Sequence, residues 1–123
     1  MRILIVEDNP ELAAVLAELL RIEGYDDVRI APDGTSGLVQ VRSSVPDAVL
    51  CDLGLPGQIN GLEFALRCRA DPALQSIYLV AISGFGEAED RQRALDAGFN
   101  ELLAKPIRFD VLIDCARRAR KEP

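Results

Sequence analysis

Five short apolar runs alternate with longer segments in which apolar residues recur at helical spacing, and this alternation constrains the fold most. Most of the runs are continuous, as is typical of strands buried on both faces of a sheet. Strands that alternate with helices form βαβ units, which build a parallel sheet with helices on both faces. The expected strands are 3–6, 28–31, 48–51, 77–82 and 102–104, of which 28–31 has the weaker, alternating pattern of an edge strand.

The intervening segments carry start and stop signals of helices. Asn9 followed by Pro10 favours a helix start, and glycine marks the helix end at Gly24 and Gly98. The five expected helices run from 10 to a stop at Gly24, from 34 to a point before Pro46, from about 62 to the Asp71-Pro72 pair, from 87 to 97 and from 108 to 120. Together these elements predict one doubly wound α/β domain over residues 1–123.

Composition excludes several classes of function. The chain has 123 residues, a formal charge of -6 and no basic cluster before Arg117, so we expect no nucleic-acid binding. It has no histidine, which excludes His-based acid–base catalysis and His metal ligands. Cys51, Cys68 and Cys115 lie among apolar neighbours without CxxC spacing, which predicts buried, reduced thiols and a cytoplasmic location. No secretory signal or membrane-spanning run is evident.

Polar residues stand where four of the predicted strands end. Glu7 and Asp8 follow the first strand, Asp52 the third, Ser83 the fourth and Lys105 the fifth. In a parallel sheet these ends lie at one edge, where open α/β folds bind their ligands. Three acids are therefore expected to meet a hydroxyl and an ammonium group in one crevice.

Crowded carboxylates repel one another unless a cation joins them. Because the available ligands are oxygens, the expected ion is Mg²⁺, which combines one or two carboxylates with a phosphate oxygen. Asp52 is a plausible nucleophile, since carboxylates form acyl phosphates. Lys105 and Ser83 would then contact the new phosphate oxygens.

Each of these residues also has a purely structural interpretation. Asp8 is suited to helix capping, Asp52 to a turn, Ser83 to a loop entry and Lys105 to the surface. Four such coincidences at strand ends of one sheet are much less frequent than any one alone. The set as a whole, and no single member, favours a phosphoryl site.

The chain resembles the receiver domain of two-component response regulators. The resemblance rests on residues 3–9 (ILIVEDN), 49–56 (VLCDLGLP), 81–84 (AISG) and 105–106 (KP), in the family's order, and covers essentially the whole chain. It implies a flavodoxin-like fold with a five-stranded parallel sheet of order 2-1-3-4-5 and five helices. The stretch 83–91 (SGFGEAEDR) is similar to receivers attached to hybrid histidine kinases, and both a single-domain regulator and a domain of a larger protein stay open.

The resemblance also implies residue roles. Asp52 matches the phosphoacceptor, with Ser83 and Lys105 as the other catalytic residues. The Mg²⁺ ligands implied are Glu7, Asp8, Asp52 and the carbonyl of Gly54, and Pro106 matches a cis-peptide position. Any enzymatic activity is expected to be limited to self-phosphorylation and slow autodephosphorylation.

The partners implied are a histidine kinase or histidine phosphotransfer protein, which donates the phosphoryl group, and a downstream protein target. Neither nucleic acid nor a membrane is an expected partner. The responsive surface implied is formed by 87–97, 102–104 and 108–120, a face through which a homodimer is also expected.

Three positions depart from the family pattern. Leu102 stands where the family has Tyr or Phe, so we expect the signal to pass through the loop after Ser83. Gln58-Ile59-Asn60 adds one residue before Gly61 and is expected to reshape a partner-facing loop. Phe85 is expected to cover an acyl phosphate and slow its hydrolysis.

Rival functions fit the sequence less well. A dehalogenase-type phosphatase needs a second acid where Gly54 stands, and a flavodoxin-like cofactor binder would not carry Glu7 and Asp8 after its first strand. A dinucleotide-binding fold lacks its GxGxxG motif. The alternative that stays open is a receiver-fold interaction module that works independently of phosphorylation, and Leu102 is the feature that supports it.

Overall fold

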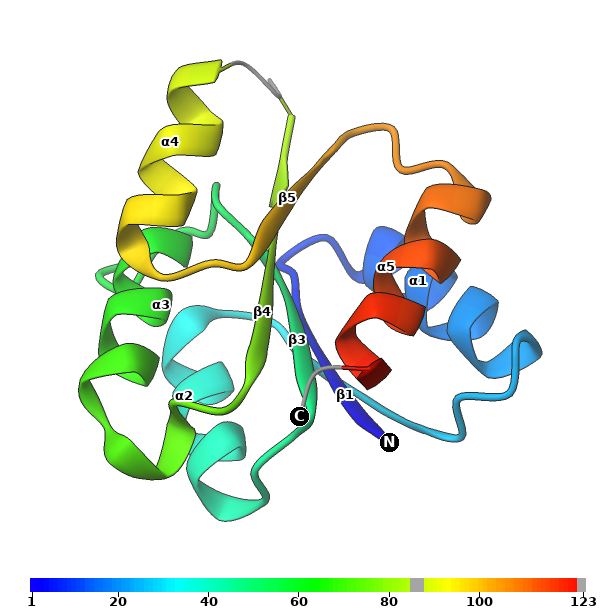
Figure 1. Ribbon diagram of the computed structural model, residues 1–123, viewed down its shortest axis with the longest axis horizontal. Helices are drawn as coiled ribbons and strands as arrows, with labels where there is room; N and C mark the ends of the chain where they lie inside the picture. Colours follow the sequence, from blue (N-terminus) through cyan, green and yellow to red (C-terminus); the bar gives the residue numbers. More distant parts are fainter. Residues whose placement is uncertain (85–87, 122–123) are drawn as a thin grey trace.

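A computed structural model describes residues 1–84 and 88–121. All strand pairs are parallel, and the sheet has the order β2-β1-β3-β4-β5 (Figure 1). This confirms the predicted doubly wound α/β fold and places the weakly patterned strand at an edge. The strands are β1 (Arg2–Val6), β2 (Asp27–Ala31), β3 (Ala48–Asp52), β4 (Tyr78–Ser83) and β5 (Glu101–Ala104).

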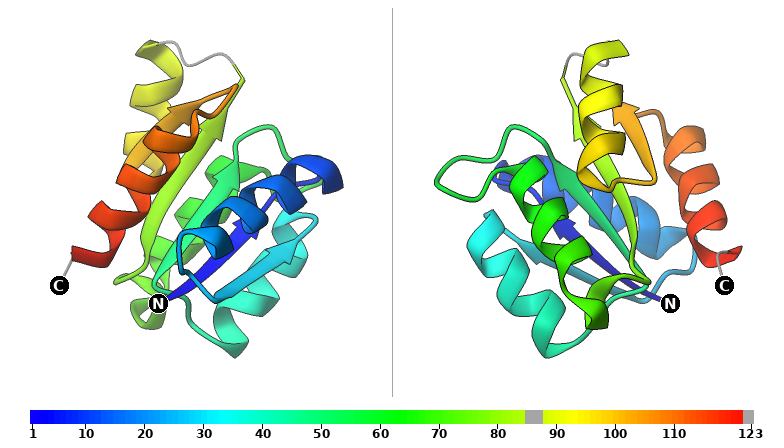
Figure 2. Two further views of the ribbon diagram at one scale, coloured as in Figure 1. Left: turned by 90° about the vertical axis from the view of Figure 1, so that its right-hand side faces the viewer. Right: turned by 60° about the vertical axis from the view of Figure 1, so that its left-hand side comes forward.

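Helices cover both faces of the sheet (Figures 1 and 2). One face carries α1 (Pro10–Ile22) and α5 (Phe109–Lys121), and the other carries α2 (Gly34–Ser43), α3 (Gly61–Ala70) and α4 (Ala88–Ala97). Over residues 1–84 and 88–121, none of the helices combines the length and the apolar content needed to span a bilayer. A short 3₁₀ helix, η1 (Pro72–Leu74), precedes β4 and was not predicted, because Asp71-Pro72 reads equally well as a plain helix end.

Side-chain caps begin three of the helices just past the carboxyl ends of the strands. Asn9 Oδ1 accepts from the N–H groups of Glu11 and Leu12 at 3.0 and 3.2 Å, and Pro10 follows it. Asp33 caps α2 and Asn60 caps α3 in the same way. These caps satisfy N–H groups that a helix start leaves unpaired, and they fix where the chain turns away from the carboxyl ends of the strands.

Two apolar layers form the core, one on each side of the sheet. Ile5, Leu16 and Leu112 belong to the layer under α1 and α5, whereas Phe64 and Leu79 belong to the layer under α2, α3 and α4. Strands β3 and β4 are buried along their whole length, as continuous apolar runs predict. The three cysteines are free and buried, which confirms their structural interpretation.

Arg69 joins α3 to the segments that lead into β4 and β5. Its guanidinium donates to the carbonyls of Gly98, Gln75 and Ile77, each at 2.9 Å, and to Asn100 Oδ1 at 3.0 Å. Four uncharged acceptors therefore satisfy one partly buried cation, in a geometry that only the planar fork of arginine matches.

We predict that Arg69→Met lowers the free energy of unfolding by about 2 kcal/mol, because the acceptors lose bonds to a charged donor. Arg67 is the matched control, since its ion pair with Glu63 on the same helix is exposed. Arg67→Met should cost under about 0.5 kcal/mol. Urea denaturation measures both values, and equal losses would contradict the role assigned to Arg69.

A second polar cluster ties β5 to β4 and α5. Arg118 donates to both carboxylate oxygens of Glu101, at 2.6 and 3.1 Å, and the hydroxyl of Tyr78 donates to the same carboxylate. Burial raises the pKa of Glu101, but the hydrogen bonds from Arg118 and Tyr78 outweigh it, so the pKa lies below its ordinary value.

A lowered pKa means that the Glu101 carboxylate stabilises the fold at neutral pH and that this contribution is lost as pH falls. We predict that Glu101→Gln costs about 1–2 kcal/mol at pH 7. The difference from the unmodified protein should shrink as pH falls below 4.5, the ordinary value for glutamate. Urea denaturation at pH 7 and at a pH below 4.5 measures this difference. Glu63→Gln is the control, because Glu63 belongs to an exposed ion pair. A difference that grows in acid would refute the assignment.

Candidate functional site

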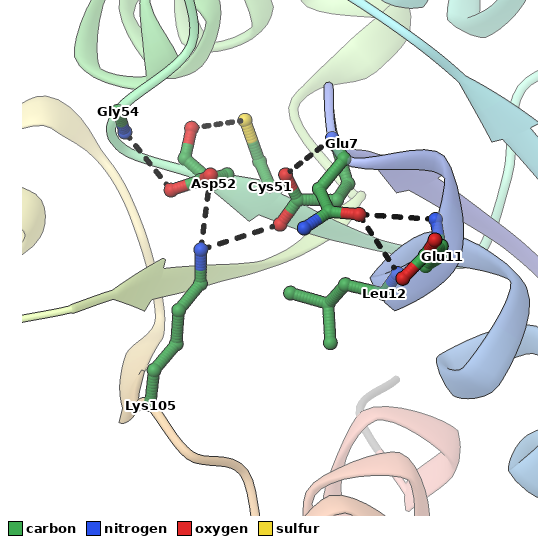
Figure 3. Close-up of polar contacts among 8 residues, drawn as sticks. Glu7, Glu11, Leu12, Cys51, Asp52, Gly54 and Lys105 are labelled. Atoms are coloured by element: carbon green, nitrogen blue, oxygen red, sulfur yellow. Dashed lines mark hydrogen bonds and ion pairs between the residues drawn. The ribbon is translucent and has the colours of Figure 1, made fainter.

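The parallel sheet brings Glu7, Asp52 and Lys105 together at its carboxyl edge (Figure 3). Asp52 ends β3, Glu7 and Asp8 follow β1, and carboxylate oxygens of all three lie within 4.8 Å of one another. Lys105, just past β5, places its Nζ 3.2 Å from Asp52 Oδ2 and 3.4 Å from Glu7 Oε1. Three acids and one ammonium group therefore lie close together at this edge of the sheet.

The Asp52 carboxylate is fixed through both of its oxygens. Oδ1 accepts from the N–H of Gly54 at 2.9 Å, and Oδ2 contacts Lys105. Behind it, a Cβ on Gly61 would lie 2.5 Å from the Asp52 carbonyl oxygen, so only glycine lets α3 begin this close to the end of β3. Gly54 thus contributes its N–H here, and the role of its carbonyl as a metal ligand stays a prediction.

Glu7 is the most buried of the three acids, with 1% of its surface exposed. Its Oε2 accepts from the N–H of Asn9 at 3.1 Å, but among the described residues Oε1 has no hydrogen-bond partner. Burial raises the pKa of Glu7 to about 7, and the charge of Asp52 acts in the same direction. The hydrogen bond from Asn9 and the charge of Lys105 oppose these effects without cancelling them.

The cluster fits a divalent cation of the Mg²⁺ type. Its ligands are carboxylate oxygens, which such hard cations prefer. Oε1 of Glu7 has the Lys105 ammonium group 3.4 Å away but no hydrogen bond among the described residues, so it is an acceptor that an ion would satisfy. The neighbouring Cys51 supplies no thiolate, because burial raises the pKa of its thiol well above the ordinary value. Glu7, Asp8 and Asp52 are the residues that could hold the ion.

Lys105 is held in the crevice rather than extended over the surface. Burial lowers the pKa of Lys105, but the hydrogen bond and the charge of Asp52 raise it further, so the net shift is upward. The ammonium group therefore stays charged beside the acids. The Lys105–Pro106 peptide bond is cis, as the resemblance implied.

Ser83 lies buried at the end of β4 and faces α4. Its Oγ donates to Asp90 Oδ2 at 3.2 Å. Both residues line a cavity of about 440 Å³ together with Asp52 and Lys105, and Asn60 and Arg93 also line it. The sequence analysis missed Asn60, Asp90 and Arg93, because the first reads as part of a turn and the others as ordinary helix charges.

The departures from the family pattern have different outcomes. Leu102 is buried in the apolar layer with Ala94, so its side chain is fixed in the core. Ile59 packs partly into the same layer, and its carbonyl would lie 2.3 Å from a Cβ on Gly34, so the longer loop docks against α2. Phe85 lies outside the described residues, and the expectation of slow hydrolysis stays a prediction.

We predict that Mg²⁺ raises the melting temperature of the unmodified chain. At ten times its dissociation constant the ion should stabilise the fold by about 1.4 kcal/mol, or roughly 4 °C. Asp8→Asn should lose most of this shift, because it removes the exposed carboxylate of the cluster. Thermal unfolding with and without Mg²⁺ measures the shift in melting temperature for each variant.

Asp26→Asn is the control for that experiment, since Asp26 is an exposed acid just before β2, at the opposite edge of the sheet. It should keep the full shift. A Mg²⁺ response that survives Asp8→Asn, or that Asp26→Asn also removes, would contradict a site built by the cluster.

The family model that matches the chain is the response regulator receiver domain, over residues 3–117. Among curated proteins, the DNA-binding response regulator MtrA of Mycolicibacterium smegmatis is 38% identical over 112 residues. That match covers 91% of this chain but 47% of MtrA, so the chain spans about half the length of that relative.

Solved structures agree in fold. The receiver domain of NtrX from Brucella abortus has a TM-score of 0.87 and 31% identity, covering 98% of this chain and 99% of that one. The signal receiver domain of a DNA-binding response regulator from Colwellia psychrerythraea has a TM-score of 0.91 and 25% identity, covering 98% of each chain. With a carboxylate cluster and a lysine at the edge where the sequence analysis expected them, the chain belongs to the receiver domain family of two-component response regulators.

Proposed function

We propose that residues 1–123 act as a phosphoacceptor receiver domain in which Asp52 takes a phosphoryl group from a phosphohistidine of a partner protein. The observation that carries this proposal is the position of the Asp52 carboxylate, buried beside two other acids and 3.2 Å from the Lys105 ammonium group. In the transfer, an oxygen of Asp52 forms a bond to phosphorus while the phosphorus–nitrogen bond breaks. The histidine ring leaves with the electron pair of that bond.

The other residues of the site would orient and neutralise the phosphoryl group. Lys105 is a point charge that would bind phosphoryl oxygens as they approach Asp52, and the Ser83 hydroxyl would donate to another of them. A Mg²⁺ ion held by Glu7, Asp8, Asp52 and the Gly54 carbonyl would supply the remaining positive charge that the phosphoryl oxygens need. The N–H of Gly54, which donates to Asp52 Oδ1, would hold that carboxylate oxygen in place while the other reacts.

The proposal extends to the partners. The donor would be a histidine kinase or a histidine phosphotransfer protein, in keeping with a chain that has no histidine of its own. The output would be a downstream protein bound at the face formed by α4, β5 and α5, with a homodimer through the same face. We place these events in the cytoplasm, in line with buried, free thiols.

We predict that the chain incubated with Mg²⁺ and acetyl phosphate gains the mass of one phosphoryl group, measured by intact-protein mass spectrometry. Asp52→Asn should abolish the gain, because the amide cannot form the acyl phosphate. Asp47→Asn is the matched control at the opposite end of the same strand and should be phosphorylated normally. Absence of any gain in the unmodified chain would instead favour the phosphorylation-independent interaction module.

A further inference from the structure

A chain of polar contacts runs from the site into α4. Ser83 Oγ donates to Asp90 Oδ2 at 3.2 Å, and Asp90 Oδ1 lies 3.6 Å from Nη2 of Arg93 one turn further along the helix. Asp90 is mostly buried, with 20% of its side chain exposed, whereas Arg93 is 63% exposed. Because both line the cavity that contains Asp52, the first turns of α4 form part of the wall of the site.

A serine hydroxyl has one proton to donate, and an ionised carboxylate can only accept. The Ser83 proton can therefore go to Asp90 or to an anion bound beside Lys105, but not to both at once. Two acceptors that need the same proton are in competition, so strengthening one weakens the other.

We propose that Asp90 is a positioning residue that competes with a phosphoryl group on Asp52 for the Ser83 proton, and that this competition couples the first turn of α4 to occupancy of the site. The inference rests on the proposed function, since it needs an anion at Asp52. When Ser83 turns to the phosphoryl oxygens, the Asp90 carboxylate loses its buried donor and keeps Arg93 as its partner.

Leu102 makes β5 unsuitable for coupling occupancy of the site to the rest of the fold through a hydrogen bond. Its side chain has no hydrogen-bonding atom and is packed in the apolar layer with Ala94 and Phe99. It can neither accept the Ser83 proton nor respond to its loss. Asp90, by contrast, lies on α4 itself and contacts Ser83 directly.

The test uses fluoroberyllate, an anion of phosphoryl shape, titrated with Mg²⁺ into the full chain and followed by amide NMR. Asp90→Ala should bind it about ten-fold more tightly, the value of one hydrogen bond to a charged group. Asp90→Asn should tighten binding by only about three-fold, since its amide oxygen still accepts, and it keeps the test valid if Asp90→Ala fails to fold.

Glu89→Ala is the matched control, because Glu89 is the preceding acid of α4 and is exposed. It should change the affinity less than about two-fold, as expected of a screened surface charge. The amide signals of α4 in anion-free Asp90→Ala should also move toward their positions in the fluoroberyllate-bound unmodified chain.

A double-mutant cycle separates competition from simple charge repulsion. In a Ser83→Ala background, removing Asp90 should bring no further gain in affinity. A gain of the same size there, or equal effects of Asp90→Ala and Glu89→Ala, would overturn the inference. Failure of the unmodified chain to bind fluoroberyllate, or binding by Asp52→Asn, would instead overturn the proposed function.

Discussion

The parallel register of the five strands is the constraint on which the site depends. Asp52 pairs with Ile82, and Ser83 pairs with Ala104, so the residues that end or follow the central strands arrive at one level. Successive side chains of a strand point to opposite faces, and a slip of one residue would turn the Asp52 carboxylate away from Glu7 and Lys105. Strands β3 and β4 are buried on both faces along their whole length. Their packing in the core therefore fixes this register.

Arg69 and Glu7 differ in how far hydrogen bonds satisfy their charged groups. Arg69 is partly buried, yet four acceptors surround its guanidinium. Glu7 is more deeply buried, and its Oε1 has an ion-pair contact with Lys105 but no hydrogen bond among the described residues. A deeply buried acid that accepts fewer hydrogen bonds than it can lowers stability at that position, a cost that functional sites bear.

The sequence predicts the sheet, its edge strand and the cluster of acids with Lys105, because each of these depends on a local pattern. Apolar runs, capping residues and polar strand ends can all be read within a few positions of the chain. It did not reach Asp90 and Arg93, whose proximity to Ser83 depends on how α4 packs. It also missed the fact that the two carboxylate oxygens of Glu7 have different partners, and that Ile59 docks against Gly34. Both features depend on tertiary packing.

The bonds of Arg69 bear on how α4 can move. Its Nε holds the carbonyl of Gly98, just past the last turn of α4, and this carbonyl is thereby tied to α3. Within residues 1–84 and 88–121, the opposite end of α4 contacts the end of β4 through the hydrogen bond from Ser83 to Asp90. Because Arg69 anchors the Gly98 end, a movement of α4 would be a rotation about that end rather than a translation along the helix axis. The largest displacement would then fall on its first turn, and the smallest beside Gly98.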